Sequence, residues 1–159
     1  MSWCAADLAK RIVIPLIVAC ALAHGQTKPN LNGVWKMDPA RSDFGAGPVS
    51  ESRLDKISLD GPNLKDTITQ KLRRGDESTY DMIYTIDGKE STNHVRGNLV
   101  KSTAQWEGDE LVIDSKVFAL RQAAIQDRWS VSTDGKTIAL RRHMTGAVTA
   151  EQKITFDRQ

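Results

Sequence analysis

The sequence predicts an all-β protein, an antiparallel up-and-down barrel of about eight to nine strands with one short helical turn. Two observations support this fold class. Short runs rich in alternating apolar residues recur beyond Gln26, separated by turn signals such as Asp60-Gly61-Pro62-Asn63 and Asp134-Gly135, which is the spacing of an antiparallel sandwich or barrel. No segment there keeps a helical apolar period for three turns. Closure into a barrel is expected because it removes exposed sheet edges.

The start of the chain has the three-part pattern of a secretory signal peptide. Lys10 and Arg11 precede a continuous apolar run over residues 12–23, and small residues follow as far as Gly25. The run is shorter than the roughly 20 apolar residues that span a bilayer as a helix. We therefore expect residues 1–25 to be removed as a signal peptide.

Cleavage after Gly25 would leave residues 26–159 as one exported domain, periplasmic or extracellular, with the lipocalin-like β-barrel as its fold. Cys20 leaves a second possibility open, because cleavage just before it would give a lipoprotein with a lipid anchor. Lipidation at Cys20 is the only membrane association that we expect. Cys4 and Cys20 are the only cysteines, so the mature domain has no disulfide and must be stabilised by packing and strand pairing.

Composition argues against several classes of function. The formal net charge is only +2, and no block of like charges exceeds two residues, which argues against nucleic-acid binding. His24, His94 and His143 show no metal-site spacing, and phosphate-binding glycine loops and a Gly-x-Ser-x-Gly turn are absent from the sequence. We expect no metal, no cofactor and no catalysis.

The elements follow in order from the apolar patterns. Val34–Met37 is a strand, and Asp38 before Pro39 predicts one helical turn over Asp38–Ser42, with the acid as cap and the proline in the first turn. Phe44–Pro48 and Ala119–Ala124 are expected loops. The remaining predicted strands are Arg53–Leu59, Leu64–Leu72, Ser78–Ile86, Leu99–Trp106, Leu111–Phe118, Ile125–Val131, Thr137–Met144 and Lys153–Asp157.

The hairpin around Asp134-Gly135 predicts which residues face each other. Flanking positions pair across the turn, and every other pair shares a face. Trp129 then lies opposite Leu140, and Asp127 lies opposite Arg142, both on the apolar face. His143 points outward. The interior of this hairpin is therefore apolar except for one acid directly across from one base.

Two further hairpins give the same kind of register. Around Gly108-Asp109, Trp106 faces Leu111 on an apolar face. The loop between Leu72 and Ser78 places Tyr84 on the face that also carries Asp66 and Gln70. Polar groups are thus expected among apolar ones inside the barrel.

The facing pair of Asp127 and Arg142 has two interpretations. It can be a buried ion pair that satisfies itself and adds little net stability. It can also be a polar anchor in a cavity, since the planar fork of arginine suits a carboxylate or a hydroxyl of a bound molecule. The residues that we expect to face such an interior site are Asp127, Arg142, Trp129, Tyr84 and Trp106.

Three segments carry a resemblance to a known family. Gly33-Val34-Trp35, with the residues that follow to Ser42, is similar to the opening of small secreted bacterial lipocalin-like proteins, and so are residues 106–113 and 127–137. In lipocalins the tryptophan of this Gly-x-Trp closes one end of the barrel, and an arginine from the last strand packs across it. The resemblance implies that Arg158 is this arginine here.

The favoured hypothesis is that the barrel binds a small hydrophobic or amphipathic ligand in its interior. The alternative is a cell-envelope structural or interaction module with a filled core, which would recognise a partner through a loop such as Phe44–Pro48 or Ala119–Ala124. A barrel of eight strands can hold one small ligand or be filled by side chains. A cavity lined by Arg142 would favour the first hypothesis.

Overall fold

The computed structural model describes residues 27–159, so the predicted signal peptide lies outside the described residues. Residues 27–159 form ten β-strands and contain no helix long and apolar enough to cross a membrane. The strands are β1 (Gly33–Asp43), β2 (Ser50–Asp60), β3 (Asn63–Leu72), β4 (Glu77–Thr85), β5 (Glu90–Val95), β6 (Asn98–Glu107), β7 (Glu110–Phe118), β8 (Ala123–Val131), β9 (Thr137–Thr145) and β10 (Ala150–Arg158).

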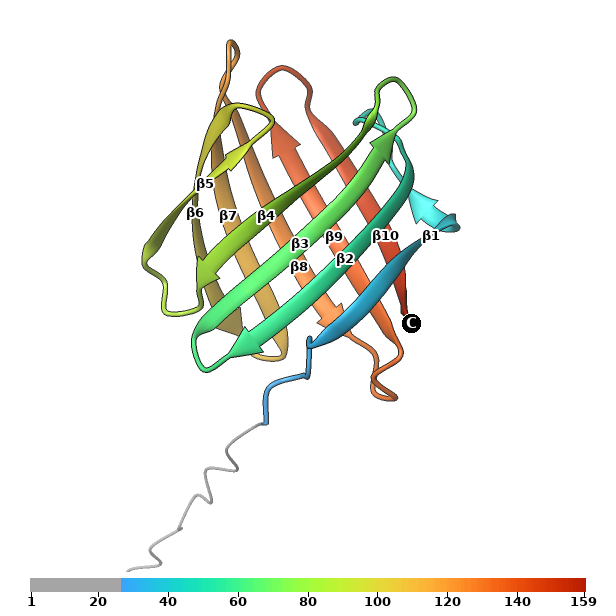
Figure 1. Ribbon diagram of the computed structural model, residues 1–159, viewed down its shortest axis with the longest axis vertical. Helices are drawn as coiled ribbons and strands as arrows, with labels where there is room; N and C mark the ends of the chain where they lie inside the picture. Colours follow the sequence, from blue (N-terminus) through green and yellow to red (C-terminus); the bar gives the residue numbers. More distant parts are fainter. Residues whose placement is uncertain (1–26) are drawn as a thin grey trace, which may run out of the picture.

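The strands form one antiparallel sheet that curls into a barrel (Figure 1). Strands that follow each other in the chain pair with each other, except β4 and β5, and β1 also pairs with β10. The sheet order is therefore β4-β3-β2-β1-β10-β9-β8-β7-β6-β5. This up-and-down order confirms the predicted all-β antiparallel barrel. It leaves β4 and β5 at the two ends of the sheet.

Side chains bridge the seam between β4 and β5. Asn93 accepts a hydrogen bond from the backbone N–H of Ile83 at 2.8 Å and donates one to its carbonyl at 2.9 Å. The backbone N–H of Thr85 donates to Ser91 Oγ at 3.1 Å. These bonds satisfy backbone groups that a neighbouring strand would otherwise pair, so the barrel is nearly closed.

The strand count and the helical turn differ from the prediction. The additional strand is β5, whose sequence Glu-Ser-Thr-Asn-His-Val lacks an apolar alternation because polar side chains make the seam. In the expected helical turn, Asp38 Oδ1 does accept a bond from the backbone N–H of Ala40 at 2.9 Å. The backbone nevertheless stays in β1, where the register against β10 is irregular between Asp38 and Asp43. A cap-like side-chain bond is therefore compatible with a strand bulge.

Two predicted hairpin registers are confirmed: Asp127 pairs with Arg142 across β8 and β9, and Trp106 pairs with Leu111 across β6 and β7. The predicted shared face of the third hairpin is also confirmed, where Leu64 pairs with Tyr84 and Asp66 with Met82 across β3 and β4. Because side chains alternate along a strand, these registers place the predicted inward faces inside the barrel.

One end of the barrel is plugged. Trp35 is fully buried there, and its Nε1 donates to the carbonyl of Leu31 at 2.8 Å. The guanidinium of Arg158 lies 4.1 Å from the centre of the Trp35 ring and donates to the carbonyls of Asn30 and Gly135. Gly33 is required beside it, because a Cβ at this position would lie 2.7 Å from Arg158. The arginine implied by the resemblance is therefore in place, and we call this the closed end.

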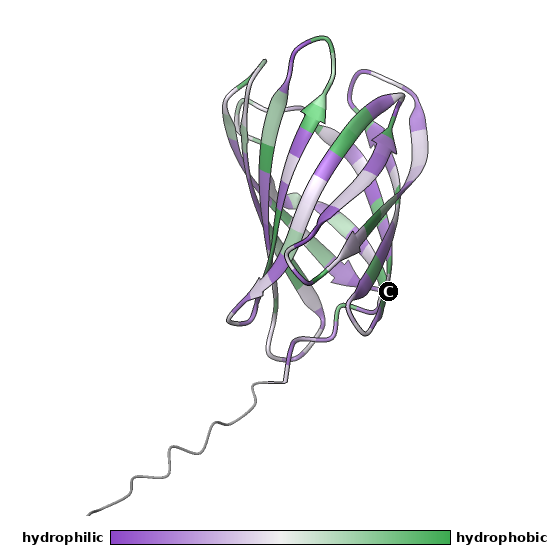
Figure 2. Cartoon of the chain, turned by 90° about the vertical axis from the view of Figure 1, so that its left-hand side faces the viewer, coloured by the Kyte–Doolittle hydropathy of each residue, from purple (hydrophilic) through white to green (hydrophobic). Residues whose placement is uncertain are grey.

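The opposite end carries the loops between β1 and β2, β3 and β4, β5 and β6, β7 and β8, and β9 and β10, and we call it the open end. Apolar segments alternate with polar ones along the strands around the whole barrel (Figure 2). The buried apolar residues form one continuous core, and polar residues interrupt it on several strands. The buried polar or charged residues are Ser50, Arg53, Asp55, Asp66, Asn93, Ser102, Asp127 and Gln152.

Candidate functional site

A cavity of about 180 Å³ lies inside the barrel and extends to the β5–β6 turn at the open end. Strands β2 to β9 contribute its walls. Its polar lining includes Arg53, Asp66, Asp127, Arg142 and Tyr84, and its apolar lining includes Ile68, Met82, Val100, Val117, Ile125 and Trp129. This combination of apolar walls with a few polar groups is typical of small-molecule sites.

Asp127 and Arg142 form a two-pronged ion pair on the cavity wall. Arg142 Nε and Nη2 donate to the two carboxylate oxygens of Asp127, each at 2.7 Å. Burial alone would lower the pKa of Arg142, but the charge of Asp127 and the hydrogen bonds to it outweigh that effect and raise the pKa. The arginine is therefore charged, and two of its five N–H groups bind its acid.

A second buried ion pair, which the sequence analysis missed, lies on β2. Arg53 Nε and Nη2 donate to the two carboxylate oxygens of Asp55, each at 2.8 Å, and Asp55 is completely buried. The coulombic attraction of Asp55 overcomes the desolvation of Arg53 and raises the pKa of the guanidinium. The sequence does contain a signal for this ion pair, because Arg53, Asp55 and the apolar Ile57 alternate along the strand and therefore lie on one face of it.

Asp66 is a third buried carboxyl, and it has no arginine of its own. It faces inward from β3 with 2% of its surface exposed. Its Oδ1 has no hydrogen-bond partner among the described residues. Burial raises the pKa of Asp66 well above its ordinary value, and the charge of Asp55 raises it further. Near neutral pH a carboxyl in such surroundings is held toward its neutral, protonated form.

Trp129 brings a second unsatisfied polar atom to the same cavity. Its ring lies parallel to that of Phe156, with 6.3 Å between the centroids. Its Nε1 is buried without a partner among the described residues, although indole N–H groups in protein interiors usually donate a hydrogen bond. The cavity therefore contains an unused donor and an unused carboxyl oxygen.

The two tyrosines add hydroxyl groups to the lining. Tyr80 donates from its hydroxyl to Gln70 Oε1 at 3.2 Å. Tyr84 is buried, and desolvation together with the neighbouring charges of Asp66 and Asp127 raises its pKa well above the ordinary value. Both are neutral phenols in the folded protein.

Four of the five predicted interior residues line the cavity: Asp127, Arg142, Trp129 and Tyr84. The fifth, Trp106, packs against the edge of the core near the β6–β7 turn, where Lys28 Nζ lies 5.9 Å from its ring centre. It is at the closed end and does not line the cavity. The reason is position along the strand, because Trp106 faces inward but lies next to a turn at the far end.

Neither of the two histidines in residues 27–159 lines the cavity. His94 is exposed on β5, and His143 points outward to an ion pair with Glu151, as its register predicted. Within residues 27–159, no group of three or more histidine, cysteine or acidic side chains is arranged to hold a metal ion.

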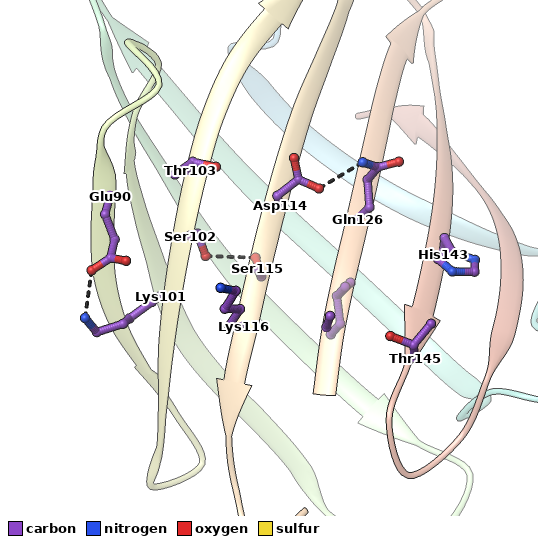
Figure 3. Close-up of a pocket in the computed structure, with 12 residues that line it drawn as sticks. Glu90, Lys101, Ser102, Thr103, Asp114, Ser115, Lys116, Gln126, His143 and Thr145 are labelled. Atoms are coloured by element: carbon purple, nitrogen blue, oxygen red, sulfur yellow. Dashed lines mark hydrogen bonds and ion pairs between the residues drawn. The ribbon is translucent and has the colours of Figure 1, made fainter. Parts of the chain in front are cut away.

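A wider depression, of about 420 Å³, lies on the outer surface of β5 to β9 (Figure 3). Polar side chains dominate it, and they bond to one another: Lys101 to Glu90 at 2.8 Å and Gln126 to Asp114 at 2.9 Å. These exposed pairs are typical of a solvated sheet face. The interior cavity, which has unsatisfied buried groups, is the better candidate for a site.

No protein-family model and no curated protein sequence matches the chain. Solved structures do match over most of its length. The secretory abundant heat soluble protein of Ramazzottius varieornatus has a TM-score of 0.60 and 14% identity, covering 84% of this chain and 98% of its own. A point mutant of the REP1-NXSQ fatty acid transporter has a TM-score of 0.55 and 15% identity, covering 81% and 98%. Fatty-acid-binding protein 1 of Echinococcus granulosus has a TM-score of 0.54 and 11% identity, covering 80% and 96%.

These similarities establish the fold, which is that of lipocalin-like and fatty-acid-binding barrels. At identities of 11 to 15% they carry no information on which residues bind a ligand, because one fold hosts many functions.

Proposed function

We propose that the protein is an exported binding protein that holds a small, partly apolar molecule in the cavity at the open end of the barrel. The observation that carries this proposal is that two of the residues that line one cavity, Asp66 and Trp129, each have a buried polar atom without a partner among the described residues, Oδ1 and Nε1 respectively. A buried polar group without a partner destabilises a fold by about 1 to 3 kcal/mol. A bound molecule that supplies the missing hydrogen bonds accounts for both groups.

The surrounding residues have different roles in such a site. Ile68, Met82 and Val100 offer apolar contact to the body of a ligand. The ion pair of Asp127 and Arg142 provides a fixed polar wall that does not need the ligand to be satisfied. Two of the similar structures are named for fatty acids, which supports an apolar component in the ligand. Catalysis is not part of the proposal.

Native mass spectrometry of the protein purified from its own host tests this function. The expected result is a reproducible added mass that is lost on unfolding. Val117→Trp, which places a large side chain in the cavity lining, should abolish the added mass while the fold is kept. Val148→Trp is the matched control, because Val148 is exposed at the same end and outside the cavity. Repeated preparations of the bare chain mass would contradict a carrier function.

Export forms the second part of the proposal, and it rests on the pattern in residues 1–25. The intact mass of the protein from its host distinguishes the two cleavage modes. A chain that begins after Ala23 or Gly25 would be free in the periplasm or outside the cell. A lipidated chain that begins at Cys20 would be anchored by its acyl groups. A full-length chain retained in the cytoplasm would contradict export.

One observation favours the alternative of a cell-envelope interaction module. Leu120, in the loop between β7 and β8, is fully exposed, and Phe118 and Val148 are exposed at the same end. The other loop considered, Phe44–Pro48, is held down by Gln152, which donates to the carbonyls of Phe44 and Pro48. This function would be favoured by a partner whose affinity falls at least tenfold with Leu120→Ser and is unchanged by Val117→Trp.

A further inference from the structure

The charges that line the cavity bear on the chemistry of its ligand, given the binding function proposed above. We propose that the cavity selects a small uncharged molecule, with a hydroxyl or carbonyl oxygen on a body the size of one aromatic ring, and discriminates against carboxylates. The unpartnered Trp129 N–H and Asp66 carboxyl supply the recognition, and the paired state of both arginines supplies the discrimination.

A buried carboxylate ligand needs a cation that is free to bind it. Arg53 and Arg142 both line the cavity, but each already gives two hydrogen bonds to an acid, Asp55 and Asp127 respectively. A ligand carboxylate could reach the remaining N–H groups of either guanidinium, but each arginine is already neutralised by its acid. The ligand would therefore bring an unbalanced negative charge into a buried site, which is unfavourable. The two pairs therefore cancel in charge and leave no cationic site in the interior.

Asp66 also disfavours the binding of an anionic ligand. Its carboxyl is 2% exposed and lines the same cavity. In the ionised form it would repel a carboxylate, and in the protonated form it offers one O–H donor and one acceptor oxygen. A hydroxyl ligand can satisfy it in either direction.

Trp129 favours the binding of a neutral ligand over a cationic one. An indole N–H can only donate, so the ligand must present an acceptor to satisfy Trp129 Nε1. A protonated amine has donors only and would also require Asp66 to ionise in apolar surroundings. A hydroxyl or carbonyl oxygen meets the requirement without creating a charge.

The cation at the rim does not change this balance. Arg96, in the β5–β6 turn, is exposed to solvent and donates to Ser78 Oγ at 3.1 and 2.8 Å. Water screens a charge at such a position far more than a buried one.

The size of the cavity limits the ligand. Its volume is about 180 Å³, and an apolar protein cavity of about 150 Å³ is known to bind benzene. A single ring with a short polar arm fits this space. Four probes share that shape and differ only at the end of the arm: 2-phenylethanol, 2-phenylethylamine, 3-phenylpropionate and ethylbenzene.

Dissociation constants for the four probes, measured by NMR titration of residues 26–159 at neutral pH, test the proposal. We expect 2-phenylethanol to bind at least tenfold more tightly than 3-phenylpropionate and more tightly than the amine and ethylbenzene. Trp129→Phe should remove at least threefold of the alcohol's advantage over ethylbenzene, while Trp106→Phe, at the closed end, should not. The ratio between two probes is insensitive to a general loss of packing, which would affect both.

A second variant inverts the preference. Asp127→Asn removes the acid from Arg142 and should raise the affinity for 3-phenylpropionate at least tenfold, because a cation inside the cavity becomes available. Tightest binding of 3-phenylpropionate or of the amine to the unaltered protein would overturn the proposed selectivity. Equal binding of all four would overturn it while leaving the binding function intact. Failure of every probe, ethylbenzene included, would overturn both.

Discussion

The two ends of this barrel use the same residue type, arginine, for opposite purposes. At the closed end, Arg158 lies against Trp35 and donates to backbone carbonyls, so that a fully buried ring plugs the barrel. Toward the open end, Arg53 and Arg142 are each paired with an acid, and a cavity remains beside them. Trp35 and Arg158 at the closed end have hydrogen-bond partners for their side-chain N–H groups. Among the described residues, the two buried side-chain atoms without a partner, Asp66 Oδ1 and Trp129 Nε1, belong to residues that line the cavity.

The largest expected effect comes from breaking the closed end. Trp35→Ala should lower the free energy of unfolding by about 4 kcal/mol, the usual loss for a buried aromatic ring. Urea unfolding measures this. A decrease in unfolding free energy of less than about 1 kcal/mol would mean that Trp35 does not stabilise the closed end more than the rest of the barrel. The contrast between the two ends would then be wrong.

Removing one partner of the cavity pair should be nearly as costly. Arg142→Met leaves Asp127 buried and uncompensated, and we expect a loss of about 3 kcal/mol. The double variant Asp127→Leu with Arg142→Met should be close to neutral, since an apolar pair of similar volume often replaces a buried ion pair without loss. The same urea measurement on the single and double variants checks this. A double variant as unstable as the single one would assign the pair a structural role.

Asp66→Asn should change the pH dependence of stability. The folded-state pKa of Asp66 lies well above its ordinary value of 3.8, so in the window between those two values the folded protein binds more protons than the unfolded chain. Stability contributed by this group is therefore lost as pH rises through that window. Relative to the unaltered protein, Asp66→Asn should therefore become progressively more stable as the pH rises above the ordinary pKa of 3.8.

Unfolding free energies at several pH values, compared between the two proteins, isolate Asp66 from the other carboxyls. Surface acids such as Asp81, whose pKa is lowered mainly by its hydrogen bond from Thr67, act in the opposite direction and are common to both proteins. A constant difference across the pH range would show that the pKa of Asp66 is the same in the folded and the unfolded protein.

The smallest effect is expected at the exposed rim of the open end. Leu120 is fully exposed, so Leu120→Ser should change the unfolding free energy by no more than about 0.5 kcal/mol. Thermal unfolding is sufficient to measure it. A larger loss would mean that the loop packs against the barrel and helps to close this end as well.

Much of this arrangement follows from local rules in the sequence. The turn at Asp134-Gly135 fixes the register that brings Asp127 to Arg142, because side chains alternate with a period of two and a slip of one residue would invert both faces. The Gly-x-Trp pattern leads to Trp35, and its family resemblance leads to Arg158. These features depend on neighbours in sequence or on a recurring motif.

The features that the sequence did not reveal depend on long-range placement. Strand β5 has polar side chains such as Asn93, which bonds across the seam to Ile83. It therefore lacks the alternation of apolar and polar residues from which the other strands were predicted. Trp106 faces inward, as predicted, but it lies at the closed end and outside the cavity. The sequence pattern shows which way a side chain faces and does not show at which level of the barrel the cavity lies. The unsatisfied state of Asp66 is a property of everything around it, and inward orientation alone could not predict it.

The indole N–H resonances of Trp129 and Trp35 offer the most direct test that the open end is a binding site and the closed end is a plug. Trp129→Phe and Trp35→Phe assign the two signals. On addition of 2-phenylethanol, we expect a saturable shift of the Trp129 signal, because a ligand oxygen accepts a hydrogen bond from its N–H. We expect no shift of the Trp35 signal, because the Trp35 N–H already donates to the carbonyl of Leu31. A Trp129 signal that stays unchanged at saturating ligand, or that moves together with the Trp35 signal, would contradict it.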